Sequence, residues 1–409
     1  MRLLACALAF LLAGVGFNVL VDPYGIFFWF ERQGINAYKP DVLSNWRTAK
    51  PLRQMLLRPD ALLVGSSRVL GAWDPAHPAF AQFNQPYNYG IPGPVLCELS
   101  KNFEFALQTR VPKRVVIGLD LFGANALFEG APCELPPELQ NRALALPRVL
   151  ISANTFNAAQ KTLFGQRRRD PNIWQPTPNG VAAISPEMPL KQGGMRAAFE
   201  YFAYGALDVQ YLPRPVCRLE IGADDPARDT LRHFRRMLDL ARAQGVEVHV
   251  ALHPVHAYLL QSLDAVGLWP QYEAWKRLVT ATVEDEARAA GAQPFPLWDF
   301  SGYNALTTEA IPPAGDKRTL MTNYWDPSHY RIPVGNAMFD RMFDVGAPRA
   351  DFGVRLASAD IDAHLARLRQ GRDAYAATHP AEVAEIAAIV ERIRQRTGCA
   401  APAGREPRR

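Results

Sequence analysis

The sequence predicts an α/β protein with a parallel β-sheet that is covered by helices on both faces. Short apolar runs alternate along the chain with amphipathic helical stretches, which is typical of this class. With 48% hydrophobic and 21% charged residues, the chain of 409 residues can bury a large core in one large or two ordinary domains. The composition excludes global disorder. A single long apolar run excludes a polytopic membrane protein.

The amino terminus predicts a membrane anchor. Residues 3–21 form the long apolar run, which follows Arg2 and stops at Asp22. About 19 residues at 1.5 Å each span roughly 28 Å, enough to cross the core of a bilayer. The alternative, a cleaved signal peptide, has a shorter apolar region and a small-x-small cleavage site. We therefore expect an uncleaved, single-pass signal anchor over residues 1–22. The rest of the chain is then expected on the periplasmic side of a bacterial cytoplasmic membrane.

Residues 23–59 are expected to be a linker and lead-in to an α/β domain over residues 60–350. The first part of this domain contains three predicted strands and one predicted helix: strands at 61–65, 87–90 and 114–120, and a helix at 94–109. Residues 121–225 break the alternation with Pro, Gly and Asn. We interpret them as a long insertion with a few helices and as a candidate lid.

Regular alternation resumes after the insertion. The predicted elements are a helix at 227–243, a strand at 246–252, a helix at 268–290, a strand at 294–300 and a helix at 333–343. Gly245 and Gly291 follow two of these helices and are typical C-terminal signals. Residues 351–409 are expected to form a C-terminal extension of two amphipathic helices, over 355–397, followed by a disordered basic tail.

Charge and cysteine content restrict the partners. The net charge of +5 is slight for 45 basic and 40 acidic residues, so nucleic acid is not an expected partner. Apart from Cys6 in the anchor, four cysteines allow three full pairings or remain as buried free thiols: Cys97, Cys133, Cys217 and Cys399. The absence of a C-x-x-C motif and of an acidic cluster near the histidines predicts no metal site. We expect no cofactor.

Three short motifs carry the candidate chemistry. In the first, Gly65-Ser66-Ser67 follows a predicted strand, where a parallel sheet exposes its functional residues. Gly-x-Ser places Ser67 in the position of a nucleophile, although Val69 replaces the second glycine of the G-x-S-x-G elbow. An ordinary helix cap is the alternative interpretation of this turn.

The second and third motifs supply the remaining parts of an acyl-transfer site. In Asn88-Tyr89-Gly90, after the second strand, backbone N–H groups are candidates to bind an oxyanion. Asp326 lies three residues before His329, a spacing that lets the carboxylate orient the imidazole as a general base. Each motif alone is compatible with a purely structural turn.

The order of these motifs resembles that of the SGNH/GDSL hydrolase superfamily over residues 61–130 and 240–345. The resemblance implies a flavodoxin-like three-layer α/β/α fold. It also implies that Ser67 is the nucleophile, that the N–H groups of Ser67 and Gly90 bind the oxyanion, and that His329 is the base oriented by Asp326.

One residue departs from the pattern of that superfamily. Its third block contains Gly-x-Asn, whose asparagine completes the oxyanion hole, whereas this chain has Asp120 at that position. A carboxylate repels an oxyanion unless it is protonated or turned away. Either a nearby amide, Asn125 or Asn88, substitutes for it, or the hole has only backbone donors.

The exported, anchored plan resembles that of proteins that O-acylate envelope polymers, such as alginate O-acetylation proteins and the D-alanyl transfer protein of teichoic acid synthesis. This implies an acyltransferase or esterase that acts on O-acyl groups of a cell-envelope or secreted polysaccharide, with a membrane-bound O-acyltransferase as a partner. The alternative is a non-catalytic accessory protein of SGNH shape, which Asp120 favours. Five further residues are candidates to line the substrate site, with core packing as the alternative: Arg68, Asp120, His253, His256 and Trp325.

Overall fold

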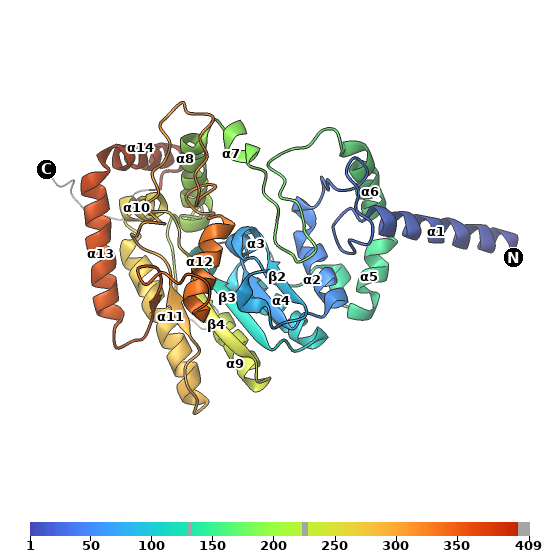
Figure 1. Cartoon of the computed structure of the whole chain (residues 1–409), viewed down its shortest axis with the longest axis horizontal. Helices are drawn as coiled ribbons and strands as arrows, with labels where there is room; N and C mark the ends of the chain where they lie inside the picture. The colour runs from blue at the N-terminus through green and yellow to red at the C-terminus, as the bar shows by residue number, and fades with distance from the viewer. Residues whose placement is uncertain (129–132, 223–227, 400–409) are drawn as a thin grey trace.

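The computed structural model describes residues 1–128, 133–222 and 228–399. Its centre is one six-stranded sheet in the order β2-β1-β3-β4-β5-β6 (Figure 1). The strands are β1 (Ala61–Gly65), β2 (Pro86–Gly90), β3 (Arg114–Leu119), β4 (Glu247–Leu252), β5 (Leu297–Asp299) and β6 (Val354–Arg355). The first five are parallel, as predicted, whereas β6 pairs antiparallel with β5. The two-residue strand β6 was not predicted because it is too short to show a pattern.

The sheet is covered on both faces. Helices α4 (Leu96–Thr109), α9 (Leu231–Ala243) and α11 (Trp269–Ala289) pack in a row over one face. Helices α3 (Ser67–Ala72) and α12 (Ile332–Phe343) contact each other over the opposite face. Every residue of β1 is buried, as expected for a strand packed on both sides. The predicted elements therefore correspond to real ones, with bounds shifted by a few residues.

Helices α2 and α10 were not predicted. Helix α2 (Trp46–Leu57) lies in the expected linker and contains Pro51, which weakens a helical signal. It packs against α4 and β2, so this part of the linker belongs to the folded body. Helix α10 (Ala257–Ala265) follows β4 directly and is buried along most of its length, so its sequence lacks the polar face of an amphipathic helix.

The described part of the insertion contains four α-helices joined by loops. Its helices are α5 (Arg142–Leu150), α6 (Ala153–Gly165), α7 (Glu187–Lys191) and α8 (Met195–Gly205). Shorter helical segments of the insertion are Phe122–Ala124, Pro137–Leu139 and Ala206–Tyr211. Two more, Leu43–Asn45 and Pro78–Phe80, lie earlier in the chain. Two disulfides, Cys97–Cys133 and Cys217–Cys399, tie the insertion to α4 and to the end of the C-terminal extension. The cysteines are therefore paired, and the free-thiol alternative is corrected for these four residues.

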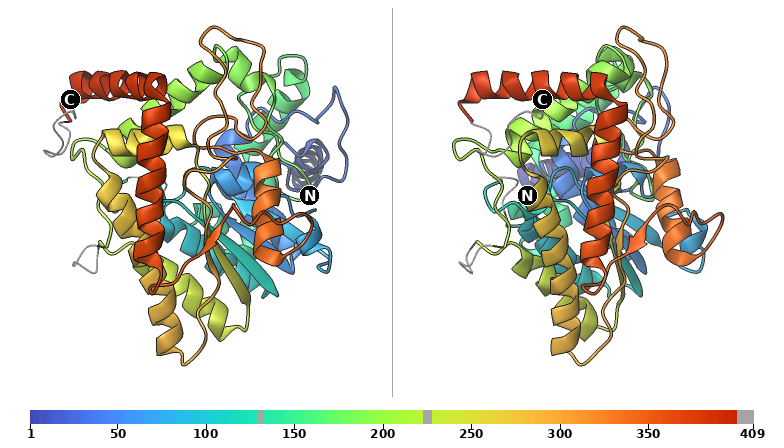
Figure 2. Two further views of the ribbon diagram at one scale, coloured as in Figure 1. Left: turned by 60° about the vertical axis from the view of Figure 1, so that its left-hand side comes forward. Right: turned by 90° about the vertical axis from the view of Figure 1, so that its left-hand side faces the viewer.

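The two ends of the described chain lie on opposite sides of the molecule. Helix α1 (Arg2–Val21) projects from the body beside α5 and α6, and its first half is exposed (Figure 1). Within the described residues it is the one helix long and apolar enough to cross a membrane. At the other end, α13 (Ile361–Thr378) stands along α11, and α14 (Pro380–Thr397) runs across its end (Figure 2). The predicted disordered tail lies outside the described residues.

Candidate functional site

The turn after β1 presents one serine and buries the other. Gly65 is required there because a Cβ would lie 2.5 Å from Cγ2 of Val69 and 3.0 Å from the carbonyl oxygen of Gly118. Ser66 is the N-cap of α3, and its Oγ accepts the backbone N–H of Arg68 at 3.2 Å. Ser67 is the first residue of α3 and is half-buried. The local geometry thus gives Ser66 a capping role and leaves the hydroxyl of Ser67 for another partner.

Within the loop Asp326–His329, hydrogen bonds to Asp326 fix the orientation of His329. One carboxylate oxygen of Asp326 accepts the backbone N–H groups of Ser328 and His329, at 2.8 and 2.9 Å. The other oxygen lies 2.7 Å from Nδ1 of His329. Because both oxygens are engaged, the carboxylate cannot rotate freely. An Nδ1–H that donates to Asp326 leaves Nε2 of the neutral imidazole as an acceptor.

Ser67 and this loop meet at the carboxyl end of the sheet. The hydroxyl of Ser67 lies 2.8 Å from Nε2 of His329, although the two residues are 262 positions apart. The three side chains form a continuous hydrogen-bonded series of hydroxyl, imidazole and carboxylate. This is the arrangement in which a serine can lose its proton to a histidine as it attacks a carbonyl carbon.

A buried ion pair connects the segments that carry the site residues. The guanidinium of Arg68 forms a salt bridge with Asp120, which directly follows β3. The same guanidinium donates to the carbonyl oxygen of Ser328 at 3.0 Å and to its hydroxyl at 2.6 Å. Arg68 therefore joins the ends of β1 and β3 to the loop that carries His329. The carboxylate of Asp120 points toward this arginine, whose positive charge compensates the negative charge of the buried aspartate.

The expected oxyanion donors have other partners. The N–H of Gly90 donates to Oδ1 of Asn88 at 2.9 Å, and a Cβ at Gly90 would lie 2.3 Å from the backbone nitrogen of Leu70. The amide of Asn88 donates to the carbonyl oxygens of Val69 and Trp73, at 2.6 and 2.7 Å. Asn88 thus caps the C-terminal end of α3, and Gly90 is needed for close packing.

Asn125 is also engaged away from Ser67. Its amide nitrogen donates to the carbonyl oxygen of Gln210, and its Oδ1 accepts the N–H groups of Leu127 and Glu220. Neither asparagine is placed as the substitute amide of an oxyanion hole. Ser67 is the first residue of α3, where the backbone N–H has no acceptor within the helix, so this N–H stays a candidate to bind an oxyanion.

Most of the expected substrate-lining residues are interior residues. Arg68, Asp120, His253, His256 and Trp325 are 0–7% exposed. Nδ1 of His253 lies 2.8 Å from the hydroxyl of Tyr330, and burial followed by the charge of Arg68 holds the pKa of His253 well below its usual value. Their burial favours the core-packing alternative, whereas their contact with a substrate stays a prediction.

Two aromatic residues of the insertion contact His329 and were not predicted. The rings of Trp174 and Phe202 meet the imidazole of His329 edge-on, with centroids 5.2 and 4.8 Å away. They shield one side of the histidine from water, as expected of a covering segment. No motif in the sequence marks them, since their sequence separation from His329 exceeds 100 residues.

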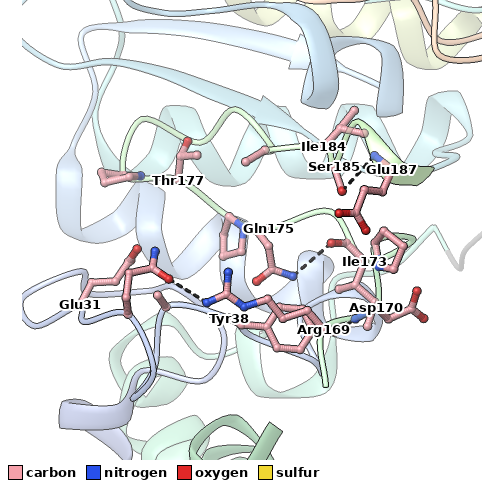
Figure 3. A pocket seen from close by; sticks show the side chains of 16 residues that line it. Glu31, Tyr38, Arg169, Asp170, Ile173, Gln175, Thr177, Ile184, Ser185 and Glu187 are labelled. Atoms are coloured by element: carbon pink, nitrogen blue, oxygen red, sulfur yellow. Dashed lines mark hydrogen bonds between the residues drawn. The ribbon is translucent and has the colours of Figure 1, made fainter. Parts of the chain in front are cut away.

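A polar cavity of about 480 Å³ lies on the outer side of the segment that carries Trp174. Trp174 packs against Gly71 of α3, while its neighbours Ile173 and Gln175 line the cavity, as does Ile184, which also lies against Gly71. Figure 3 shows the polar side chains around it, with Gln175 donating to the carbonyl of Ile173 and Ser185 accepting the N–H of Glu187. Hydroxyl, amide and carboxylate groups in one hollow are suited to polar ligands such as sugars.

Neither metals nor known relatives add to this description. Among residues 1–128, 133–222 and 228–399, no group of three or more histidine, cysteine or acidic side chains is placed to hold a metal ion. No family model and no curated protein matches the sequence.

Proposed function

We propose that this protein is a membrane-anchored, extracytoplasmic SGNH-type acyltransferase or esterase that acts on O-acyl groups of a cell-envelope or secreted polysaccharide. The observation that carries the proposal is the convergence of Ser67, His329 and Asp326, with contacts of 2.8 and 2.7 Å. A structural turn at Gly65-Ser66-Ser67 would not require a histidine-carboxylate pair at the second serine.

The proposed reaction has two steps. Ser67 transfers its proton to Nε2 of His329 and its oxygen attacks the acyl carbonyl, so that an ester forms on Ser67. The departing alcohol takes the proton from His329, whose positive charge Asp326 stabilises in the meantime. A sugar hydroxyl or water then gives its proton to His329, attacks the ester and releases Ser67. The backbone N–H of Ser67 is the donor that we assign to the oxyanion.

The position of the site in the sheet supports the fold that the proposal needs. The order β2-β1-β3-β4-β5 is that of flavodoxin-like doubly wound sheets. After β1 the chain adds β2 on one side and then returns to add β3 on the other side, so the order of the strands reverses between β1 and β3. Ser67 and Asp120 lie just after these two strands. Ligands of doubly wound folds bind at this switch point.

Two features support the proposed location and substrate. The apolar helix α1 is long enough to anchor the chain, and the two disulfides fit an oxidising compartment outside the cytoplasm. The polar cavity on the outer side of the segment that carries Trp174 offers a polysaccharide a binding surface, and Trp174 itself contacts His329. A membrane-bound O-acyltransferase would be the donor of acyl groups in such a system.

The oxyanion region favours the alternative of a non-catalytic accessory protein. Gly90 donates its N–H to Asn88, and the amides of Asn88 and Asn125 donate to backbone carbonyls away from Ser67, so these expected donors are engaged elsewhere. Removal of one oxyanion donor lowers turnover by about 10²–10³. A protein of this shape that only binds polymer or an acyltransferase would retain the fold without needing these donors.

Covalent labelling distinguishes the two. The full-length chain in detergent is treated with a serine-directed phosphonate, which needs an activated hydroxyl but not efficient turnover. We expect labelling of the wild type, loss of it in Ser67→Ala, and retention in Ser66→Ala, which removes only a cap worth about 1 kcal/mol. Equal labelling of wild type and Ser67→Ala would remove Ser67 from the role. A folded wild type that is not labelled would favour the accessory protein.

A further inference from the structure

An apolar groove runs along the anchor helix where it joins the body. It encloses about 480 Å³ between α1 and the corner that joins α5 to α6. On the α1 side it extends from Phe10 to Asn18, and on the other side it is lined by Leu150–Ala153 and Phe156. Figure 1 shows α5 and α6 on either side of α1 at the point where it leaves the body.

The corner is fixed to α1 by direct contacts. The amide of Asn18 donates to the carbonyl oxygen of Leu150 at 2.8 Å, and the rings of Phe17 and Phe156 lie 5.3 Å apart. Despite this, Ile151 and Phe156 remain 57% and 40% exposed. Large apolar side chains of this exposure, beside an apolar helix, are what a lipid-facing surface presents.

The length of α1 determines how deep this corner lies. Its 20 residues span about 30 Å, which equals the thickness of the bilayer core and leaves no spare turn. Phe17 and Asn18 are three to four residues from its C-terminal end, or roughly 5 Å along the axis. When α1 spans the core, the corner held by these two residues lies inside the hydrocarbon, and the groove continues to Phe10 near the midplane.

Several backbone groups of the corner have partners inside the protein, as such a position requires. Buried backbone groups must find partners inside the protein because lipid offers none. The N–H groups of Ile151 and Ser152 donate to the carbonyls of Pro147 and Val149. The hydroxyl of Ser152 accepts the N–H of Asn154 at 3.1 Å, and the carbonyl of Leu150 is satisfied by Asn18.

From these contacts we infer that the α5–α6 corner is immersed in the outer leaflet and that the groove between it and α1 holds a phospholipid acyl chain. The body then rests on the membrane instead of hanging from a flexible tether. The inference depends on α1 crossing the bilayer, as proposed above, but not on acyl transfer at Ser67.

Spin labels test the immersion in the full-length chain, reconstituted in nanodiscs of phosphatidylcholine and phosphatidylglycerol. Two variants, Ala153→Cys and Ile151→Cys, each carry one label at the corner, and in both of them Cys6→Ser removes the native free cysteine. The matched control is Ala377→Cys, an exposed alanine near the other helix corner, between α13 and α14, on the far side of the body. In a separate sample, the wild-type chain is labelled at Cys6, which reports whether α1 itself lies in the bilayer. Collision rates with oxygen, which enters lipid, and with a water-soluble nickel chelate are then measured.

We expect the oxygen-to-nickel ratio at 151 and 153 to resemble that at Cys6 and to be several-fold higher than at 377. If the two corner labels behave like 377 while Cys6 is in lipid, the anchor stands and the immersion is overturned. If Cys6 also meets the nickel chelate, the anchor itself fails and the inference falls with it. Corner labels shielded from both reagents would show that protein fills the groove, which contradicts occupation by lipid.

Discussion

Two aspartate–histidine pairs in this molecule have the same nitrogen–oxygen distance and different surroundings, the first through Nδ1 of its histidine and the second through Nε2. Asp326 and His329 are separated by 2.7 Å between the nearest oxygen and nitrogen, and so are Asp299 and His364. In the first pair, the other nitrogen of the imidazole faces the hydroxyl of Ser67. In the second, the carboxylate also binds the ammonium of Lys276 at 2.5 Å and the hydroxyl of Ser301 at 2.6 Å.

The additional cation changes what the second pair can do. Burial alone would raise the pKa of Asp299, but Lys276 and then His364 hold it below its usual range. The cluster joins β5, α11 and α13, and the side chains of Asp299 and Lys276 are fully buried. It therefore acts as a brace between elements. An aspartate–histidine pair becomes a candidate site only when the second imidazole nitrogen faces a hydroxyl, as Nε2 of His329 faces Ser67.

The largest difference between the pairs is expected in turnover. Asp326→Asn should lower release of a chromophore from a small acyl ester by about 10⁴, because the amide no longer selects the tautomer of His329 that accepts the proton of Ser67. Asp299→Asn, the matched change, should leave the rate per folded molecule within a few-fold of the wild type. Circular dichroism checks that both variants fold. Equal losses in the two variants would mean that the pairs do not differ in function.

The brace should dominate stability. Lys276→Met leaves the carboxylate of Asp299 buried beside one partner fewer, and removal of one member of a buried ion pair typically costs about 3–5 kcal/mol. Urea denaturation should therefore show a much lower free energy of unfolding for this variant than for Ser67→Ala, whose hydroxyl is half-buried. A Lys276→Met protein as stable as the wild type would contradict the assignment of the cluster as a brace.

A third histidine sharpens the contrast because it has no carboxylate partner at either nitrogen. Nδ1 of His256 accepts the N–H of Tyr258, and Nε2 lies 2.8 Å from the carbonyl oxygen of Glu309. Burial lowers the pKa of His256 to about 4. The unfolded state, with a pKa near 6.5, binds the proton first, so the stability from neutral His256 is present above pH 6.5 and lost as the pH falls toward 4.

The expected loss over that interval is roughly 3 kcal/mol from this residue. The free energy of unfolding, measured by urea denaturation at several pH values, should fall less steeply with acid in His256→Asn than in the wild type. Asparagine can still cap α10 and does not titrate. Parallel pH profiles for the two proteins would show that His256 does not titrate as described.

Local patterns were sufficient for the five parallel strands and for the three separate motifs. Apolar β-branched runs marked β1, β3 and β4, because a strand covered on both faces must be apolar throughout. Gly-x-Ser singled out Ser67, and the three-residue spacing of Asp326 and His329 reflects a contact within one loop. Each of these features depends on neighbours in the chain, so the sequence alone could indicate it.

The remainder of the site was decided by contacts between distant segments. Arg68 neutralises Asp120 only because β1 and β3 lie side by side, and the amide of Asn88 is bound by carbonyls of α3 because β2 packs against that helix. The pairing of Asp299 with His364 spans 65 residues and left no local trace. Hydrogen-bond partners and burial set the charge and availability of each polar group, and both are properties of the packed structure. For this reason the sequence identified which residues can react, whereas the tertiary structure determined which of them are free to do so.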